Sequence, residues 1–350
     1  ERCPFIEYRK LTAVLLLFDM IMILAVPRLR IEEGWVGIAS VVWALIIAIW
    51  VVITDRVVAY GKREEEERLT GRSETRRTLK EWLAVGTSEI VLIAVTAAIV
   101  CMSATLIIRS RDSSYHEPGH RYFVDGDKYQ VHLYCGGPPM GDAPRNNGLP
   151  TVLFEAGEQP FSQSMMLMAD NMVANFTIDR YCFYDRPGFG WSDNAPSPFS
   201  AGMDADVLSE ALARAGEKGP WVLVSAGVGS IYSRIFSSRH GTEVEGLLLI
   251  DPLHEDLLGR VGASHRGFML WLRGVLSPLG IDRILGTLFK GRTIVDRIYG
   301  RSAYQTGKYI KAKLQENLVA DSLTKNEVIS SRAIQNKDTP FVVVSSGVEM

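Results

Sequence analysis

A short run in the second half of the chain has the form of a turn that presents a nucleophile. Residues 221–236, WVLVSAGVGSIYSRIF, read as an apolar strand, a turn of small residues and the start of an amphipathic helix. A serine on such a turn, written G-x-S-x-G, needs small residues two places on either side because the turn is tight. Ser225 and Gly229 hold the flanking places, and Gly227 holds the central one. The sequence therefore predicts the bend without an attacking oxygen.

Other side chains near this turn have chemistry of their own, and each also has a simpler structural interpretation. Ser225 and Ser230 are substitute nucleophiles, but both are more simply small residues that let a strand and a helix pack closely. Asp251 directly follows a predicted strand and is the candidate acid. His254 lies near the expected mouth of the site, where most histidines are only solvated. We therefore expect no intact set of catalytic residues.

The elements around the turn alternate between strands and helices. Four short apolar runs suit parallel strands that are buried on both faces: 151–155, 180–184, 221–224 and 247–250. A hairpin at 121–135 precedes them, and a mostly helical segment at 255–336 interrupts the sheet before a strand at 340–345. We expect an α/β fold with a mostly parallel sheet, helices on both of its faces and a helical cap at 255–336.

Three separated motifs resemble the α/β-hydrolase fold superfamily, in particular its esterase and haloperoxidase-like branch. The run YDRPGFGWS at 184–192 is similar to the family's D-R-x-G-x-G-x-S turn, and the elbow and the strand before Asp251 follow in the family's order. The resemblance covers about residues 120–350. It implies structural roles in these turns for Asp185, Arg186, Gly188, Gly190, Ser192 and Gly229.

The resemblance also assigns the parts of a catalytic site. In the family an elbow serine attacks, a histidine after the last strand takes its proton, and an acid orients that histidine. This places the nucleophile at Gly227 and the oxyanion-hole donors at Val228 and near Gly157 and Glu158, although a carboxylate at Glu158 opposes this role unless it points away. All six histidines precede the last strand seen. We expect the family's final strand and helix to be missing, and the acid is Asp251 or a residue beyond position 350.

The first 110 residues form a predicted membrane region. Residues 11–27, 35–54 and 90–108 are apolar runs near the length that a helix needs to cross the hydrocarbon core, about 20 residues. Asp19 interrupts the first run and is costly in lipid unless it is paired, hydrated or facing another helix. We therefore predict three transmembrane helices, followed by the hydrolase-like domain at 111–350, and treat Asp19 as a helix-contact or functional position.

The side of the membrane follows from charge. Lys and Arg are more frequent before the first run and between the second and third, which places everything after residue 110 on the non-cytoplasmic side. Cys135 and Cys182 are the pair in the globular part that could form a disulfide. A glycosylation sequon at Asn175 has a consequence only if this part faces the secretory lumen.

Composition excludes several kinds of partner. The net charge of −2 gives no case for nucleic acid, and the sequence has neither a metal-ligand spacing nor a glycine-rich phosphate loop, so we expect no metal and no cofactor. The chain is also similar to uncharacterised fungal membrane-anchored proteins, some of them labelled mitochondrial, which makes a mitochondrial membrane one candidate location.

The favoured hypothesis is a membrane-anchored, catalytically degenerate hydrolase-like protein. It would act as a subunit of a membrane assembly or as a binder of an apolar ligand, with the lipid bilayer as its other partner. Two alternatives stay open. One is an active serine ester or lipid hydrolase, in which Gly227 is engineered or another residue attacks. The other is a transport or assembly role of the membrane helices and Asp19.

Overall fold

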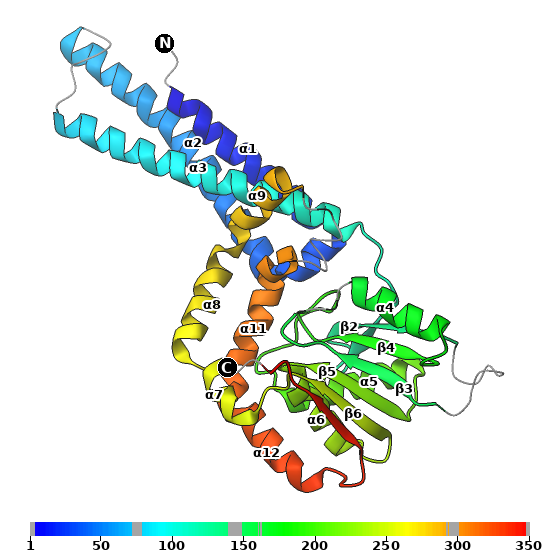
Figure 1. Cartoon of the computed structure of the whole chain (residues 1–350). Helices are drawn as coiled ribbons and strands as arrows, with labels where there is room; N and C mark the ends of the chain where they lie inside the picture. The colour runs from blue at the N-terminus through cyan, green and yellow to red at the C-terminus, as the bar shows by residue number, and fades with distance from the viewer. Residues whose placement is uncertain are drawn as a thin grey trace. The chain divides into compact units, whose positions relative to one another are not determined.

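The chain forms two compact units. The computed structural model describes residues 4–71, 79–138, 149–159, 161, 163–291, 293 and 301–347 (Figure 1). One unit is Glu1–Tyr115 with Pro278–Lys290, and the other is His116–Ser277 with Gly291–Met350. The segment Pro278–Lys290 lies within the stretch expected to form the cap, but it packs with the N-terminal helices instead.

The first unit is helical. It contains α1 (Pro4–Ala25), α2 (Pro27–Thr70), α3 (Leu79–Ser113) and α9 (Ile281–Phe289). Among the described residues, two helical stretches are long and apolar enough to cross a membrane, Pro27–Leu69 and Trp82–Ser113. The helix α1 is not one of the two, although it contains most of the first apolar run. A break in α2 lies at Gly34, whose φ of 61° is not helical.

The helix α1 packs lengthwise against both α2 and α3 (Figure 1). Two small apolar clusters fill the space between the three helices: Leu16, Leu45 and Ile99 in one, and Ile23, Leu29 and Leu106 in the other. The hydroxyls of Thr12 and Thr96 are 3.1 Å apart. These contacts make α1 parallel to α3 and antiparallel to α2. Asp19 of α1 is buried in this bundle, where Ser103 of α3 lies within hydrogen-bonding reach.

The second unit is built on a sheet of seven strands. The strands are β1 (His120–Val124), β2 (Tyr129–Gly136), β3 (Thr151–Glu155), β4 (Tyr181–Asp185), β5 (Trp221–Ala226), β6 (Val244–Ile250) and β7 (Phe341–Val344). Their order is β1-β2-β4-β3-β5-β6-β7. β2 runs antiparallel to both neighbours, and every other pairing from β4 to β7 is parallel. This mostly parallel arrangement is the α/β-hydrolase-like fold, so the predicted fold class is confirmed.

Helices cover both faces of the sheet because its strands are apolar on both sides. On one face, Leu153 and Leu223 pack with α5 (Ala201–Ala215) and α6 (Gly229–Arg239). On the other, Phe154 and Phe183 stack with ring centroids 4.6 Å apart, next to Tyr181. The Tyr181 hydroxyl donates to Asp170 of α4 (Gln163–Ala174) at 2.5 Å, which places α4 on this second face.

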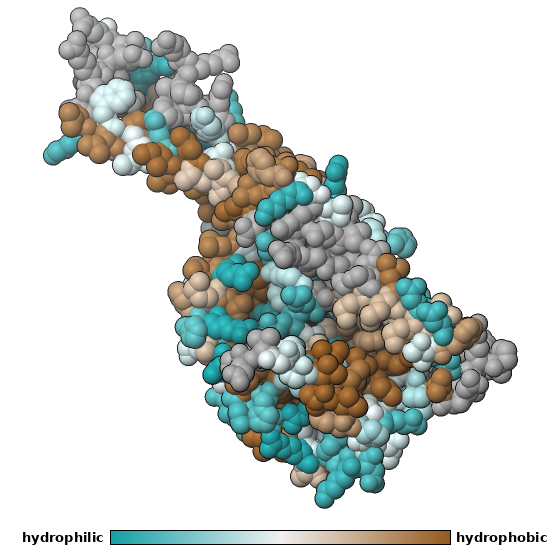
Figure 2. Space-filling model, viewed as in Figure 1, coloured by the Kyte–Doolittle hydropathy of each residue, from teal (hydrophilic) through white to brown (hydrophobic). Residues whose placement is uncertain are grey.

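The stretch between β6 and β7 is mostly helical. It holds α7 (Leu258–Val261), α8 (Ser264–Leu276), α11 (Gly307–Val319) and α12 (Lys325–Ile334) in this unit. The helix α11 packs against α8, and α12 packs against α6. Of the described strands, β7 forms the edge of the sheet, and its four side chains are about half exposed. Figure 2 shows hydrophobic side chains gathered near this edge.

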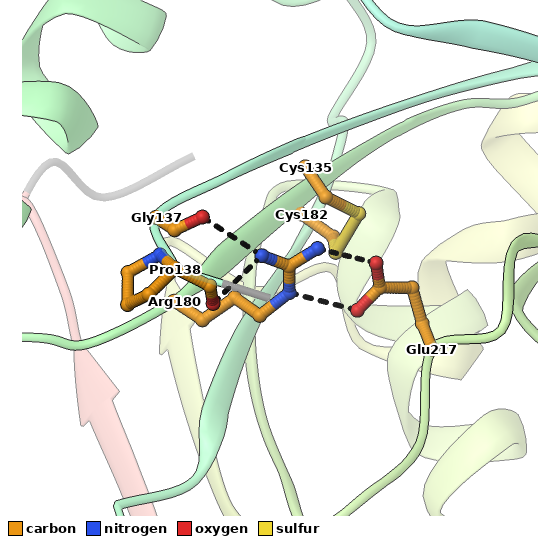
Figure 3. Close-up of a disulfide and its surroundings, with 6 residues drawn as sticks. All are labelled: Cys135, Gly137, Pro138, Arg180, Cys182 and Glu217. Carbon is orange, nitrogen blue, oxygen red and sulfur yellow. Dashed lines mark hydrogen bonds and ion pairs between the residues drawn. A yellow bond between two sulfur atoms is a disulfide. The ribbon is translucent and has the colours of Figure 1, made fainter. Parts of the chain in front are cut away.

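A disulfide joins two neighbouring strands. Cys135 of β2 and Cys182 of β4 lie opposite each other in the antiparallel register and are bonded, as the sequence suggested (Figure 3). Beside them, Arg180 donates to both carboxylate oxygens of Glu217 and to the carbonyl oxygens of residues 137 and 138. These contacts hold the end of β2 next to the start of β4.

Candidate functional site

The turn after β5 has the geometry of a nucleophile elbow. Gly227 adopts a φ of 53°, a left-handed conformation that glycine takes at little cost. Its N–H donates to Ile250 O at 3.0 Å, and its carbonyl accepts from Leu253 N at 3.0 Å. A Cβ atom built on Gly227 would meet nothing within 4 Å. The apex therefore has room for a side chain, yet carries none.

The two glycines beside the apex are required by close backbone packing. A Cβ on Gly229 would lie 2.5 Å from Ala156 O, and a Cβ on Gly157 would lie 2.9 Å from Ala226 O. Real Cβ atoms essentially never approach this closely. The loop after β3 is therefore pressed directly against the elbow, which is the arrangement that an oxyanion hole needs.

The residues predicted to form the oxyanion hole lie at this junction. Val228 is buried at the start of α6, and Gly157 lies in the loop after β3. The carbonyl of Glu158 accepts from the Tyr309 hydroxyl at 2.7 Å. The carboxylate of Glu158 is exposed and lies 3.6 Å from Arg266 Nη2. Its negative charge is therefore partly balanced by a cation of α8.

Neither substitute serine is free to attack. Ser230 Oγ donates to Gly227 O at 2.7 Å and accepts from Leu253 N at 3.1 Å, so it fixes the turn. Ser225 is 2% exposed, and its Oγ has no hydrogen-bond partner. It lies inside β5, in register with Glu155 of β3 and away from any open surface. Both residues are better explained by packing than by nucleophilic chemistry.

The candidate acid and the candidate histidine do not meet. Asp251 has a φ of 43°, and its Oδ1 accepts from Ser346 N at 2.5 Å. His254 is mostly exposed and accepts from Asp256 N at 3.3 Å through Nδ1. Across the described ranges, no histidine hydrogen-bonds to Asp251. In the described part of the chain, the structure therefore brings the bend and the oxyanion loop together and places neither His254 nor another histidine against Asp251.

A buried histidine and aspartate form a pair that sequence reasoning missed. His132 of β2 is opposite Asp185 of β4 in the sheet register, and its Nδ1 lies 2.9 Å from Asp185 Oδ2. The same oxygen accepts from Trp191 N at 3.1 Å. Ser192 Oγ accepts from His132 N and donates to Asp185 O. The antiparallel pairing of the hairpin with β4 is the signal that could have found this pair. All its members are buried, and it holds the turn at 186–192 rather than reacting.

The glycines of that turn are fixed by the same contacts. A Cβ on Gly190 would overlap the carboxylate of Asp185, and a Cβ on Gly188 would overlap Ala312 of α11. Gly188 also has a φ of 84°. The turn therefore needs glycine to fit between the sheet and the cap.

Arg186 ties this turn to the loop at the elbow. Its guanidinium is 2% exposed and donates to Glu155 Oε1 at 2.9 Å, to Gly157 O at 2.7 Å and to Ala156 O. It also lies 3.4 Å from Glu316 Oε1 of α11. The guanidinium carbon is 4.3 Å from the centroid of the Tyr232 ring of α6. Arg186 therefore links the loop after β3, the cap and the helix that follows the elbow.

Burial dominates the electrostatics around Arg186. It raises the pKa of Glu155 well above its usual value, and Arg186 opposes this shift. Burial likewise raises the pKa of Asp204 in α5 to about 7, against the effects of Arg186 and the Tyr184 hydroxyl. Burial also favours a higher pKa for Glu316, but Lys313 and Arg186 together lower it below its usual value. These groups form a structural charge cluster.

One hollow and one set of metal-ligating side chains among the described residues could be considered for a bound group. The hollow beside Arg186 and Tyr232 is about the size of one water molecule. Cys135, Cys182 and Glu217 are close enough to share a metal ion. Their sulfurs, however, are bonded to each other, and Arg180 occupies both oxygens of Glu217 (Figure 3). We assign no metal to this set.

Comparison with known proteins finds fungal relatives. Residues 7–135 match a family described as a region of unknown function (DUF2417). The chain is 34% identical to an uncharacterised protein of Schizosaccharomyces pombe, over 98% of the chain and 69% of that protein. It is 25% identical to an uncharacterised vacuolar membrane protein of Saccharomyces cerevisiae, over 77% of the chain and 50% of that protein. The chain thus spans between half and about two thirds of the length of these relatives.

Solved structures with the same fold are distant in sequence. An α/β hydrolase enzyme from a deep-sea metagenome library is 13% identical, with a TM-score of 0.45 over 65% of the chain and 88% of that structure. The Cif epoxide hydrolase from Acinetobacter nosocomialis is 15% identical, with a TM-score of 0.48 over 71% of the chain and 80% of that structure. The assignment of the fold rests on the strand order of the sheet, and no branch of the superfamily is singled out.

Proposed function

Given that the chain belongs to the family of the Schizosaccharomyces pombe protein, we propose that it is a membrane-anchored α/β-hydrolase-like protein that acts by binding rather than by catalysis. The observation that carries the proposal is Gly227. The turn keeps the left-handed conformation and the open space of a nucleophile elbow, yet it offers no atom for attack. Its partner is another subunit of a membrane assembly or an apolar ligand.

The distance between two groups of ion pairs, one at each end of the helical unit, supports membrane anchoring. Arg9 and Asp55 pair at one end, and Arg109 pairs with Glu32 and Glu33 at the other. From residue 35 to residue 55, α2 rises about 30 Å at roughly 1.5 Å per residue. The hydrocarbon core of a bilayer is also about 30 Å thick. The apolar surface between these charges is therefore as long as a bilayer is thick.

The packing of α1 supports a third span. Its contacts reach from Thr96 to Leu106 of α3, so α1 occupies the same depth as the other two helices. Asp19 is 3% exposed and lies inside the bundle rather than on its outer surface. This burial favours the helix-contact interpretation of Asp19 over a transport role.

The second unit is proposed to lie on the non-cytoplasmic side of the membrane. Disulfides persist in oxidising compartments, and Cys135–Cys182 joins two strands of this unit, with Cys182 buried and Cys135 half-buried. Asn175, in the sequon, lies exposed in the turn after α4. The name of the Saccharomyces cerevisiae relative favours a vacuolar membrane over the mitochondrial one.

One observation keeps an active ester or lipid hydrolase as the second candidate. The free space around a Cβ at position 227 would accommodate a serine, with the loop after β3 already in place beside it. A serine in place of Gly227 would therefore fit without displacing its neighbours.

Labelling with a serine-directed fluorophosphonate tests the two candidates. The intact protein in its native membrane should not be labelled, because neither Ser225 nor Ser230 is available. Gly227→Ser is the matched variant, and labelling of this variant alone would show that only the nucleophile had been lost. Labelling of the unaltered protein that disappears in Ser225→Ala or Ser230→Ala would overturn the proposal in favour of a working hydrolase.

A further inference from the structure

The helix α9 has the opposite polarity to a helix on the surface of a soluble protein. Arg283 is 5% exposed and donates through Nη2 to Asp112 of α3 at 2.7 Å. In contrast, Ile281, Leu288 and Phe289 are 55%, 71% and 80% exposed. A helix beside water normally buries its apolar face and exposes its charges. Here the guanidinium of Arg283 points into the protein and these three apolar side chains point out, so the surroundings of this face of α9 favour apolar groups.

The outward side chains form one continuous face. Ile281, Leu285, Leu288 and Phe289 are separated by four, three and one residues, and Leu285 is also 46% exposed. Residues at i, i+4, i+7 and i+8 follow a single stripe along a helix. The helix can therefore contact an apolar surface along its whole length with this one face.

The contacts of α9 fix its level on α3. A Cβ on Gly280, which precedes α9, would overlap the side chain of Thr105, and Leu279 O lies 3.3 Å from Thr105 Oγ1. Asp112 is two turns further along α3, and Arg109 between them binds Glu32 and Glu33 of α2. The helix α9 therefore lies at the charged end of the apolar surface, where a membrane-spanning helix would leave the hydrocarbon core.

We propose that α9 is an interfacial helix whose apolar face inserts into the boundary between the acyl chains and the headgroups of the bilayer. The bilayer is chosen over a protein partner because α9 contacts α3 between Thr105 and Asp112, beside the Arg109 ion pairs, which is the level where the apolar part of α3 ends. Helices with one apolar face and a charged opposite face bind membranes in this way. The proposal rests on the membrane anchoring proposed above.

The chain path gives this helix a mechanical role. The second unit ends at Ser277 and resumes at Gly291, so both ends of the segment that contains α9 connect to the hydrolase-like unit. With the connection at Tyr115, three covalent links join that unit to the membrane region. An inserted α9 would anchor the middle of the cap sequence to the bilayer surface.

Nitroxide accessibility measures the depth of α9 directly. The intact protein, with its free thiols replaced, is labelled at one introduced cysteine and reconstituted into phosphatidylcholine vesicles. Leu288→Cys tests the proposal, and Leu285→Cys repeats it on the same face. Val95→Cys in α3 is the lipid reference and Phe123→Cys in β1 is the aqueous reference, because both native side chains are 47% exposed. Collision with oxygen reports lipid, and collision with a water-soluble nickel chelate reports water.

The proposal predicts that oxygen accessibility relative to nickel is several-fold higher at positions 285 and 288 than at 123, and lower than at 95. If 288 behaves like 123 while 95 is in lipid, the interfacial helix is overturned and the membrane anchoring stands. If 288 is shielded from both reagents, a protein partner covers α9 and the proposal also fails. If 95 itself is accessible to nickel, the membrane anchoring fails.

Discussion

At the scale of single residues, the two glycines of the elbow have different physical tasks. Gly227 supplies a left-handed backbone conformation in open space, whereas Gly229 allows the carbonyl of Ala156 to approach the start of α6. A side chain at position 227 therefore meets only conformational strain. A side chain at position 229 must push a backbone segment away.

Replacing each glycine by alanine distinguishes the effect of backbone conformation at position 227 from the effect of close packing at position 229. Gly227→Ala should lower the free energy of unfolding by about 1 kcal/mol, the usual cost of placing a non-glycine residue at positive φ. Gly229→Ala should cost more, on the order of 2–4 kcal/mol, because overpacking is added to the backbone shift. Pulse proteolysis of the purified protein in urea measures both. Equal losses, or a larger loss for Gly227→Ala, would contradict this assignment.

The elbow could be predicted from the sequence, but the pair of His132 and Asp185 could not. The elbow is local, since small residues two places apart predict a tight bend wherever they occur. His132 and Asp185 are 53 residues apart, and only the antiparallel register of β2 with β4 brings them together. Local sequence patterns do not fix such a register, so they could not predict that His132 pairs with Asp185.

At the scale of elements, Arg186 is the link between the elbow loop and the cap. It contacts Glu155 at the end of β3 and the two residues that follow, and it reaches α11 through Glu316. The loop could not keep its position against the elbow if these contacts were lost, because its two carbonyls and a buried carboxylate would be left without a donor.

Replacement of Arg186 by methionine should therefore be strongly destabilising. Arg186→Met should cost about 3–5 kcal/mol in the free energy of unfolding, the usual result of leaving one buried partner of an ion pair. Arg186→Met combined with Glu155→Gln should recover part of this loss. Arg214→Met is the control, because Arg214 also pairs with two carboxylates but is exposed, and it should change the free energy of unfolding far less than Arg186→Met. An equal loss for both arginines would refute the role of Arg186.

Strands and helices of the sheet were predictable, whereas the partner of α9 was not. Runs such as Thr151–Glu155 are buried on both faces, so apolar composition alone identifies them. The segment around α9 is also apolar, and the sequence placed it in the cap. Hydropathy does not distinguish a helix that faces a protein core from one that faces lipid. The internal Arg283–Asp112 pair supplies that distinction, and it joins residues 171 positions apart.

At the scale of the whole molecule, the disulfide and the sequon both support the proposed location of the second unit on the non-cytoplasmic side of the membrane. Cys135–Cys182 and Asn175 lie in one unit, and both would be chemically meaningful only if that unit faces an oxidising, glycosylating compartment. They are independent of the Lys and Arg counts that gave the orientation from sequence. Agreement among three different kinds of chemistry is the reason to test this orientation first.

Endoglycosidase digestion tests the orientation. The protein expressed in yeast should carry a glycan on Asn175, so enzyme treatment should increase its electrophoretic mobility. Asn175→Gln and Thr177→Ala should abolish the part of the shift due to this site, while Thr177→Ser should retain it. Maleimide should label Cys135 and Cys182 only after reduction. Absence of the shift together with labelling before reduction would place the unit in the cytosol.

The polarity of α9 also bears on how the hydrolase-like unit could be prepared in water. Deleting the first 115 residues removes α3, which neutralises Arg283 and receives one side of α9. The remaining polypeptide would then expose a stripe of four apolar side chains, and it should aggregate during purification. A hydrophilic linker from Ser277 to Gly291, in place of the excised helix, is therefore the rational starting point for a monodisperse fragment suited to crystallisation.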